Sequence, residues 1–388
     1  MKKLFCIVLA LLLCLMLSVS AVAIENSKVT EDLTSFVVVV ANKVRDVLEA
    51  IELQKDDFGL GDIDFSTLAL GNEIPSYELT SSGLVHIDNV HYFPVLSGEE
   101  WVATAVVSYS EYGDMNVEVS AKYAADYMKL SRETDAYTAG KTNSVAIVFD
   151  STDAYLYSAH GCVLIESFQK IPGRKTLAAC TERISPTTVE VACQRPIELQ
   201  LSSLAQERYS GNGQVAKDSE NFASLIITAI TQPTNYTCWA ASTAMILNYR
   251  GTAVSVANVV SEANVNMYTY RSAAHCANLI RDEYGYPCGT WGTSSGYYYS
   301  LTLNNLITEL YSFSSPLFAG FGSGSVGHAV VIKGYTNLSA TPTMSYIDPA
   351  DGFIKASTIP NNGAVTITYG GNSHELAAAF AVYEKYDY

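Results

Sequence analysis

The chain has 388 residues, and 48% of them are hydrophobic, which provides apolar surface for two or three folded domains. Its formal net charge of −16 comes from 39 acidic and 23 basic side chains. Nucleic acids and anionic membranes attract basic patches, so this balance argues against both as partners of the mature chain.

Residues 1–23 have the pattern of a secretory signal peptide. Lys2 and Lys3 give a basic start typical of bacteria, residues 4–17 are an apolar core, and Ala21–Ala23 is an A-x-A cleavage site. A retained membrane anchor is the alternative, but the apolar run is short for a membrane span. We therefore expect a bacterial chain that is secreted to the extracellular space, with no membrane association in its mature form.

Residues 24–209 are predicted to form a first domain of the α+β class. An amphipathic helix is expected over residues 30–53, because apolar residues recur there at helical spacing. A second helix is expected over residues 121–132. Short alternating segments predict the strands, and these are residues 83–87, 91–96, 101–109, 115–120, 144–149, 154–158 and 188–193.

Residues 210–221 are polar and contain glycine, so we expect an exposed linker where proteolytic cleavage concentrates. A second domain is predicted over residues 222–388, in which residues 266–300, rich in Tyr, Gly and Ser, resemble a loop region and residues 301–310 a helix. Neither CxxC nor HExxH occurs in the chain, so no common zinc site is expected, and no cofactor.

Removal of the signal peptide leaves six of the eight cysteines. Spacing alone allows Cys276 to pair with Cys288, and Cys180 with Cys193, while Cys162 is left over. Sequence does not fix this connectivity. The sixth remaining cysteine, Cys238, is a candidate nucleophile.

Cys238 opens a predicted helix that ends near Gly251, with Thr237 as a candidate N-cap. A thiol at a helix N-terminus lies at the positive end of the helix dipole, which favours the thiolate. The backbone N–H groups there have no partner within the helix and can bind an oxyanion. Gln232, six residues earlier, can supply a second donor. The alternative is a buried cysteine in a core helix.

His328 begins a β-branched strand that reaches Tyr335, and Asp348 ends a second short strand 20 residues later. An imidazole can draw the proton from a thiol, and a carboxylate can orient that imidazole. Asp351 is a near competitor for the acidic position. The alternatives are a core histidine and an Asp-Pro turn.

The order Gln232, Cys238, His328 and Asp348 resembles that of papain-like (clan CA) cysteine peptidases. The sequence segments around His328 and Asp348 resemble those of bacteriocin-leader peptidases and of staphopain-like secreted peptidases. The resemblance covers about residues 225–350 and implies an α+β fold, with Cys238 on a helical part and His328 and Asp348 on an antiparallel sheet. It also implies peptide hydrolysis through a thioester, with protein or peptide substrates. The chain departs from papain in using aspartate rather than asparagine.

The position of residues 24–209 ahead of this domain suggests a zymogen whose prodomain inhibits the enzyme within the same chain. The alternative is a permanent adhesion or substrate-binding domain. Three other functions stay open for the whole chain, which are a transglutaminase-like acyltransferase, a cell-wall amidase and a non-catalytic secreted binding protein. Ammonia release or amine crosslinking without peptide cleavage would indicate the acyltransferase.

Overall fold

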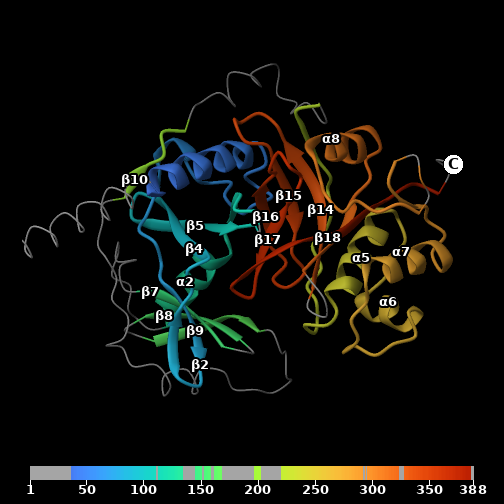
Figure 1. The fold of residues 1–388 in the computed structure, drawn as a ribbon, viewed down its shortest axis with the longest axis horizontal. Helices are drawn as coiled ribbons and strands as arrows, with labels where there is room; N and C mark the ends of the chain where they lie inside the picture. The colour runs from blue at the N-terminus through green and yellow to red at the C-terminus, as the bar shows by residue number, and fades with distance from the viewer. Residues whose placement is uncertain are drawn as a thin grey trace, which may run out of the picture. The chain divides into compact units, whose positions relative to one another are not determined.

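The computed structural model places most of the chain, and its ribbon is shown in Figure 1. The residues it describes are 36–110, 112–133, 145–150, 153–158, 161–167, 196–201, 220–291, 293, 295–322 and 327–385. The predicted signal peptide, strand 188–193 and most of the predicted linker lie outside these residues, as do Cys180 and Cys193.

Residues 1–43 and 44–388 are two compact units. Of the first unit only residues 36–43 are described, and they begin a helix that ends at residue 52. In the second unit the helix buries Val44, Val47, Leu48 and Ile51 at the predicted spacing. The helix expected over residues 30–53 is therefore confirmed for its described part.

The larger sheet is antiparallel in all its described pairings and runs through both halves of the second unit. Its main path has the order β10, β1, β4, β5, β6, β16, β15, β14, β13, β18 and β12, and β11 and β17 pair at its side. Its strands are β1 Leu68–Leu70, β4 Val90–Ser97, β5 Glu100–Tyr109, β6 Met115–Ser120, β10 Ile197–Glu198, β11 Phe222–Ser224, β12 Cys288–Gly289, β13 Leu317–Phe321, β14 His328–Thr336, β15 Thr343–Ile347, β16 Ile354–Thr358, β17 Thr366–Tyr369 and β18 Asn372–Val382.

The pairing of β6 with β16 joins the region before residue 209 to the region after residue 222. Val119 lies opposite Ala356, and Glu118 lies opposite Ser357. The Asn116 side-chain amide also donates to the carbonyl of Thr366 at 3.1 Å. Backbone and side-chain hydrogen bonds therefore connect the two regions across the predicted linker.

A smaller sheet has the order β3, β2, β7, β8 and β9. Its strands are β2 Ser76–Thr80, β3 Gly83–His86, β7 Val145–Phe149, β8 Asp153–Ser158 and β9 Gly161–Ser167. Helix α2, Lys122–Glu133, contacts both β5 and β9, and one apolar cluster joins Trp101, Tyr123 and Leu156. Seven strands were predicted in this half, and the six that are described are confirmed, while β1, β2, β9 and β10 were not predicted.

Three helices cover the start of the second half, and Figure 1 shows them grouped in yellow and orange beside β14 and β18. They are α5 Cys238–Tyr249, α6 Val256–Glu262 and α7 Ala273–Asp282. Residues 238–247 of α5 are all buried, which is expected of a helix that is apolar on every side. This helix packs on β13 and β14 in one apolar core.

The predicted loop over residues 266–300 is wrong in part, because it contains α7. Ser272 caps that helix by accepting from the N–H of His275, and Cys276, Ala277 and Ile280 form its buried face. The helix expected over residues 301–310 is present as α8, Leu303–Leu306, followed by the π-helix η4, Ile307–Ser312. A short 3₁₀ turn, η1, covers Phe65–Thr67.

Candidate active site

Cys238 is the first residue of α5 and is buried. Thr237 occupies the N-cap position, as predicted, but its hydroxyl does not cap the helix. It donates instead to the carbonyl of Thr234 at 2.8 Å, and the Thr234 hydroxyl donates to the carbonyl of Met267 at 2.6 Å. The loop before Cys238 is therefore fixed by its own hydrogen bonds, and the first N–H groups of α5 are left without a side-chain acceptor.

Gln232 lies in this loop with 1% of its surface exposed. Its backbone N–H donates to the carbonyl of Pro349 at 2.7 Å, directly after Asp348. The loop that carries Gln232 and the turn that carries Asp348 are therefore tied to one another.

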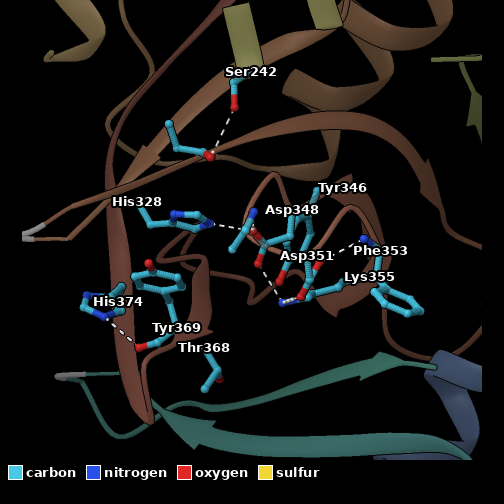
Figure 2. A network of polar contacts seen from close by, with 12 residues as sticks. Ser242, His328, Tyr346, Asp348, Asp351, Phe353, Lys355, Thr368, Tyr369 and His374 are labelled. Carbon is cyan, nitrogen blue, oxygen red and sulfur yellow. Dashed lines mark hydrogen bonds and ion pairs between the residues drawn. The ribbon is translucent and has the colours of Figure 1, made fainter. Parts of the chain in front are cut away.

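His328 is the first residue of β14, and Asp348 follows β15, so antiparallel pairing of these two strands brings both residues to one end of the sheet. The His328 Nε2 atom lies 2.6 Å from Asp348 Oδ1. Figure 2 shows this pair beside the ring of Tyr369, which stacks on the imidazole with centroids 4.1 Å apart and planes 1° from parallel.

Helix α5 meets this pair directly. Cys238 lies close enough to the His328 imidazole for hydrogen bonding and charge to raise the pKa of His328, and both residues line the same cavity. The Ser242 hydroxyl, one turn along α5, donates to the carbonyl of Ala329 at 3.2 Å and so fixes the helix against the strand that begins at His328. The structure thus places Cys238, His328 and Asp348 in one cluster, with the loop that carries Gln232 beside the Asp348 turn.

The charges in this cluster favour a protonated imidazole. Burial is the strongest single effect on His328 and lowers its pKa, but the charge and hydrogen bond of Asp348, together with Cys238, raise that pKa to about 10. Burial likewise acts to raise the pKa of Asp348, but Lys355 and His328 hold it well below its ordinary value. An imidazolium–carboxylate pair is the expected form at neutral pH.

Two lysines stand behind Asp348, and sequence reasoning missed both. Lys355 Nζ lies 2.6 Å from Asp348 Oδ2 and 3.3 Å from Asp351 Oδ2. Lys122 Nζ, from the first half of the chain, lies 3.1 Å from Asp351 Oδ2. Asp351, the competitor for the acidic position, thus faces lysines and not His328. No local signal marks Lys122, because its partner lies more than 200 residues away.

The Asp348 turn needs glycine at position 352. Gly352 has φ +79°, which an L side chain rarely adopts, and an added Cβ would meet the Thr231 methyl at 2.9 Å. Its N–H donates to the carbonyl of Asp348 at 2.7 Å. The glycine closes the turn that presents the carboxylate to His328.

A cavity of about 560 Å³ opens at Cys238 and His328. Tyr297, Phe318 and Phe321 give it an apolar wall, and every residue that lines it lies between 238 and 378. An apolar cavity beside a thiol is suited to a peptide side chain.

The other candidates of the sequence do not join this cluster. Cys162, Cys276 and Cys288 are buried free thiols, so the pairing of Cys276 with Cys288 that spacing allowed is not formed. Burial raises the pKa of Cys288 to about 12 and that of Cys276 further still. His275 hydrogen-bonds to Ser272, its own helix cap. The His374 Nε2 atom lies 3.1 Å from the carbonyl oxygen of Tyr369, at the edge of the site.

The described residues contain no group of three or more His, Cys, Asp or Glu side chains arranged to hold a metal ion. No helix among them is both long and apolar enough to cross a membrane.

Residues 224–365 match the model of the Peptidase_C39 like family. No curated protein matches the chain. One similar solved structure is the peptidase domain of Streptococcus ComA, a bifunctional ABC transporter involved in quorum sensing, with 13% identity, a TM-score of 0.29, and coverage of 40% of this chain and 98% of that chain.

Two further structures have the same TM-score of 0.29. A double-glycine-motif protease from an AMS/PCAT transporter, in complex with a leader peptide, is 19% identical over 42% of this chain and 94% of that chain. Digestive procathepsin L 3 from the larval midgut of Tenebrio molitor is 14% identical over 45% of this chain and 72% of that chain.

Proposed function

We propose that this chain, a papain-like cysteine peptidase whose C39-like domain spans residues 224–365, is a secreted bacterial endopeptidase. Cys238 is its nucleophile, His328 its general base and acid, Asp348 the residue that orients His328, and Gln232 an oxyanion donor. The observation that carries the proposal is the contact of the Cys238 thiol with an imidazole that is bonded to Asp348 at 2.6 Å.

In the proposed resting state His328 already holds the proton of Cys238, so the reaction begins from a thiolate–imidazolium pair. The thiolate attacks the carbonyl carbon of the scissile peptide bond. The Cys238 N–H and the Gln232 side-chain amide stabilise the oxyanion that forms, an effect of about 3 kcal/mol for one donor. His328 then protonates the leaving amine, and a thioester remains on Cys238.

Water completes the cycle. His328 takes a proton from the water, whose oxygen attacks the thioester carbonyl, and the C–S bond breaks to release the acid product and the thiol. Asp348 holds one ring nitrogen of His328 throughout, so the other nitrogen stays directed at the sulfur and the water. His328 therefore carries each proton that moves, and the one used in this second half of the cycle comes from the water.

Three further parts of the proposal concern the whole chain. It is exported by residues 1–23, it is made as a zymogen, and it is cut within residues 210–221. The order of the regions and the polar linker support this. Since β6 pairs with β16, we expect the first region to remain bound after the cut. We also predict that the first region inhibits the enzyme before the cut. A comparison of the peptidase activity of the cut and the uncut chain tests this.

The test uses the full chain and its Cys238→Ala and His328→Ala variants. A thiol-reactive epoxide is expected to add once, on Cys238, in the wild type. Both variants are expected to lose at least about 10⁴-fold in peptide cleavage, because nucleophile and base act as one unit. Intact mass reports any cut within residues 210–221, and the N-terminus of the extracellular form reports removal of residues 1–23.

An unlabelled Cys238 in a chain cut at the linker would contradict the proposed function. The family match favours peptide cleavage over the acyltransferase, amidase and binding-protein alternatives. Amine incorporation without cleavage, measured on the same protein, would reverse that order.

A further inference from the structure

A second cavity, of about 480 Å³, lies next to the first. Tyr270 lines both cavities, and Tyr369, which stacks on His328, also lines the second. A peptide whose scissile bond lies at Cys238 can therefore place one side chain in the apolar cavity and another in the second.

The first region of the chain supplies much of the wall of this second cavity. Glu78 on β2, Asp88 before β4 and Asp150 after β7 line it, and no lysine or arginine does. The ring of His86 bonds to Asp88 at 2.6 Å, and the ring of His374 bonds to the carbonyl of Tyr369. Three carboxylates in a wall that has two histidines but no lysine or arginine favour a cationic group.

A buried amide points to a ligand independently of these charges. Asn235 lines the cavity with 6% of its surface exposed, three residues before Cys238. Neither its Oδ1 nor its Nδ2 has a hydrogen-bond partner in the described structure. A buried amide without partners is costly. The C=O and N–H groups of an extended peptide would satisfy both atoms.

The strand β7 of the first region packs closely against the turn between β17 and β18. Gly371, in the turn between β17 and β18, has φ +73°, and an added Cβ would lie 3.0 Å from the ring of Phe149 on β7. This close packing keeps the acidic wall near Tyr369 and hence near His328.

We propose that this second cavity binds a lysine or arginine side chain of the peptide substrate, with Glu78, Asp88 and Asp150 selecting the charge and Asn235 binding the adjacent main chain. The inference rests on the proposed function, and it makes the first region a part of the substrate site rather than only a prodomain.

The test is cleavage of unstructured fluorogenic peptides by the full chain. Each series carries Lys, norleucine or Glu at one of the three positions on either side of the scissile bond. At one position we expect kcat/KM for Lys to exceed that for norleucine by about tenfold at low salt, and the ratio to fall as salt screens the carboxylates. The double variant Glu78→Gln/Asp88→Asn is expected to lower this ratio about fivefold.

Glu99→Gln is the matched control, because Glu99 is an exposed acid in the turn between β4 and β5 that does not line the cavity. It should leave the ratio unchanged. Asn235→Leu should raise KM for all three peptides alike, by about tenfold, the effect of one or two lost hydrogen bonds.

The outcomes separate the two proposals. If the epoxide labels Cys238 and peptides are cleaved, but the Lys ratio stays near one at every position, the inference is overturned and the proposed function stands. A ratio that survives Glu78→Gln/Asp88→Asn also overturns it. If Cys238 is unlabelled and nothing is cleaved, the proposed function fails and the inference fails with it.

Discussion

The two walls that meet at the thiol and the imidazole differ in what surrounds them. The helical wall is α5, whose residues 238–247 are buried among apolar side chains. The sheet wall is a cluster of charged groups, in which His328, Asp348 and Lys355 are buried and Asp351 is half-buried. Apolar packing holds the first wall and ion pairing holds the second.

The difference matters for how each wall responds to its surroundings. Apolar packing is nearly independent of pH, while buried charges stabilise a fold only as long as each has its partner. The sheet wall also depends on the first region, since Lys122 pairs with Asp351 and the Tyr346 hydroxyl donates to Glu118. The geometry at His328 is therefore coupled to residues far away in the chain, whereas the position of Cys238 is set locally.

The largest effect is expected from Lys355→Met, which removes one partner from the buried network. Asp348 then loses its lysine and Asp351 keeps only Lys122, so we expect the free energy of unfolding to fall by about 3–5 kcal/mol. The pKa of Asp348 should rise, and the acidic limb of the kcat/KM profile should move to higher pH. Lys55→Met, at a partly exposed lysine, is the control and should cost less than about 1 kcal/mol. A Lys355→Met protein as stable as the wild type would show that the network does not hold this wall.

Leu247→Ala tests the helical wall in the same assay. Leu247 is 0% exposed, and removal of a buried leucine side chain costs about 3 kcal/mol. Because no titrating group is involved, the loss should be equal at pH 6 and pH 9 by denaturant unfolding. If the loss in free energy of unfolding changed with pH by more than about 1 kcal/mol, the helical wall would not differ from the sheet wall in its response to pH.

Local patterns in the sequence predicted the helical wall and both functional strands. A helix start at Cys238, a β-branched strand after His328 and a short strand before Asp348 are each visible within about ten residues. The resemblance to a known family then supplied their relative placement, which no single segment contains. The described strands of the first half could be predicted for the same reason, because alternation is a local property.

The sheet wall could not be completed in this way. Lys122 and Glu118 bind partners 229 and 228 residues away, and nothing near either residue marks it as buried and paired. The pairing of β6 with β16 is likewise a contact between residues far apart in the chain. Helix α7 was missed for a different reason, because the Tyr-, Gly- and Ser-rich residues around it concealed a ten-residue helix with a serine cap.

The pH dependence of stability should report the sheet wall alone. The folded-state pKa of His328, about 10, lies above its ordinary value of 6.5, so its contribution is complete below pH 6.5 and is lost as the pH rises through 10. Within that window the free energy of unfolding should fall by up to about 1.4 kcal/mol per pH unit. His328→Asn should remove this slope and Leu247→Ala should retain it. A wild-type curve that is flat from pH 6.5 to 10 would contradict the ion-pair description.

The smallest effect is expected at Glu118, where a substitution should increase stability instead of lowering it. Burial, the largest influence, raises the pKa of Glu118, while the charge of Lys355 lowers it. A carboxyl group whose folded pKa lies above its unfolded value of 4.5 stabilises the fold below pH 4.5 and loses that contribution as the pH rises. Glu118→Gln keeps an acceptor for the Tyr346 hydroxyl and cannot ionise. The variant should therefore match the wild type near pH 4 and exceed its stability by about 1 kcal/mol at pH 8. If the variant and the wild type were equally stable at both pH values, Glu118 would be ionised and fully paired. The negative charge of Glu118 would then help to stabilise the sheet wall.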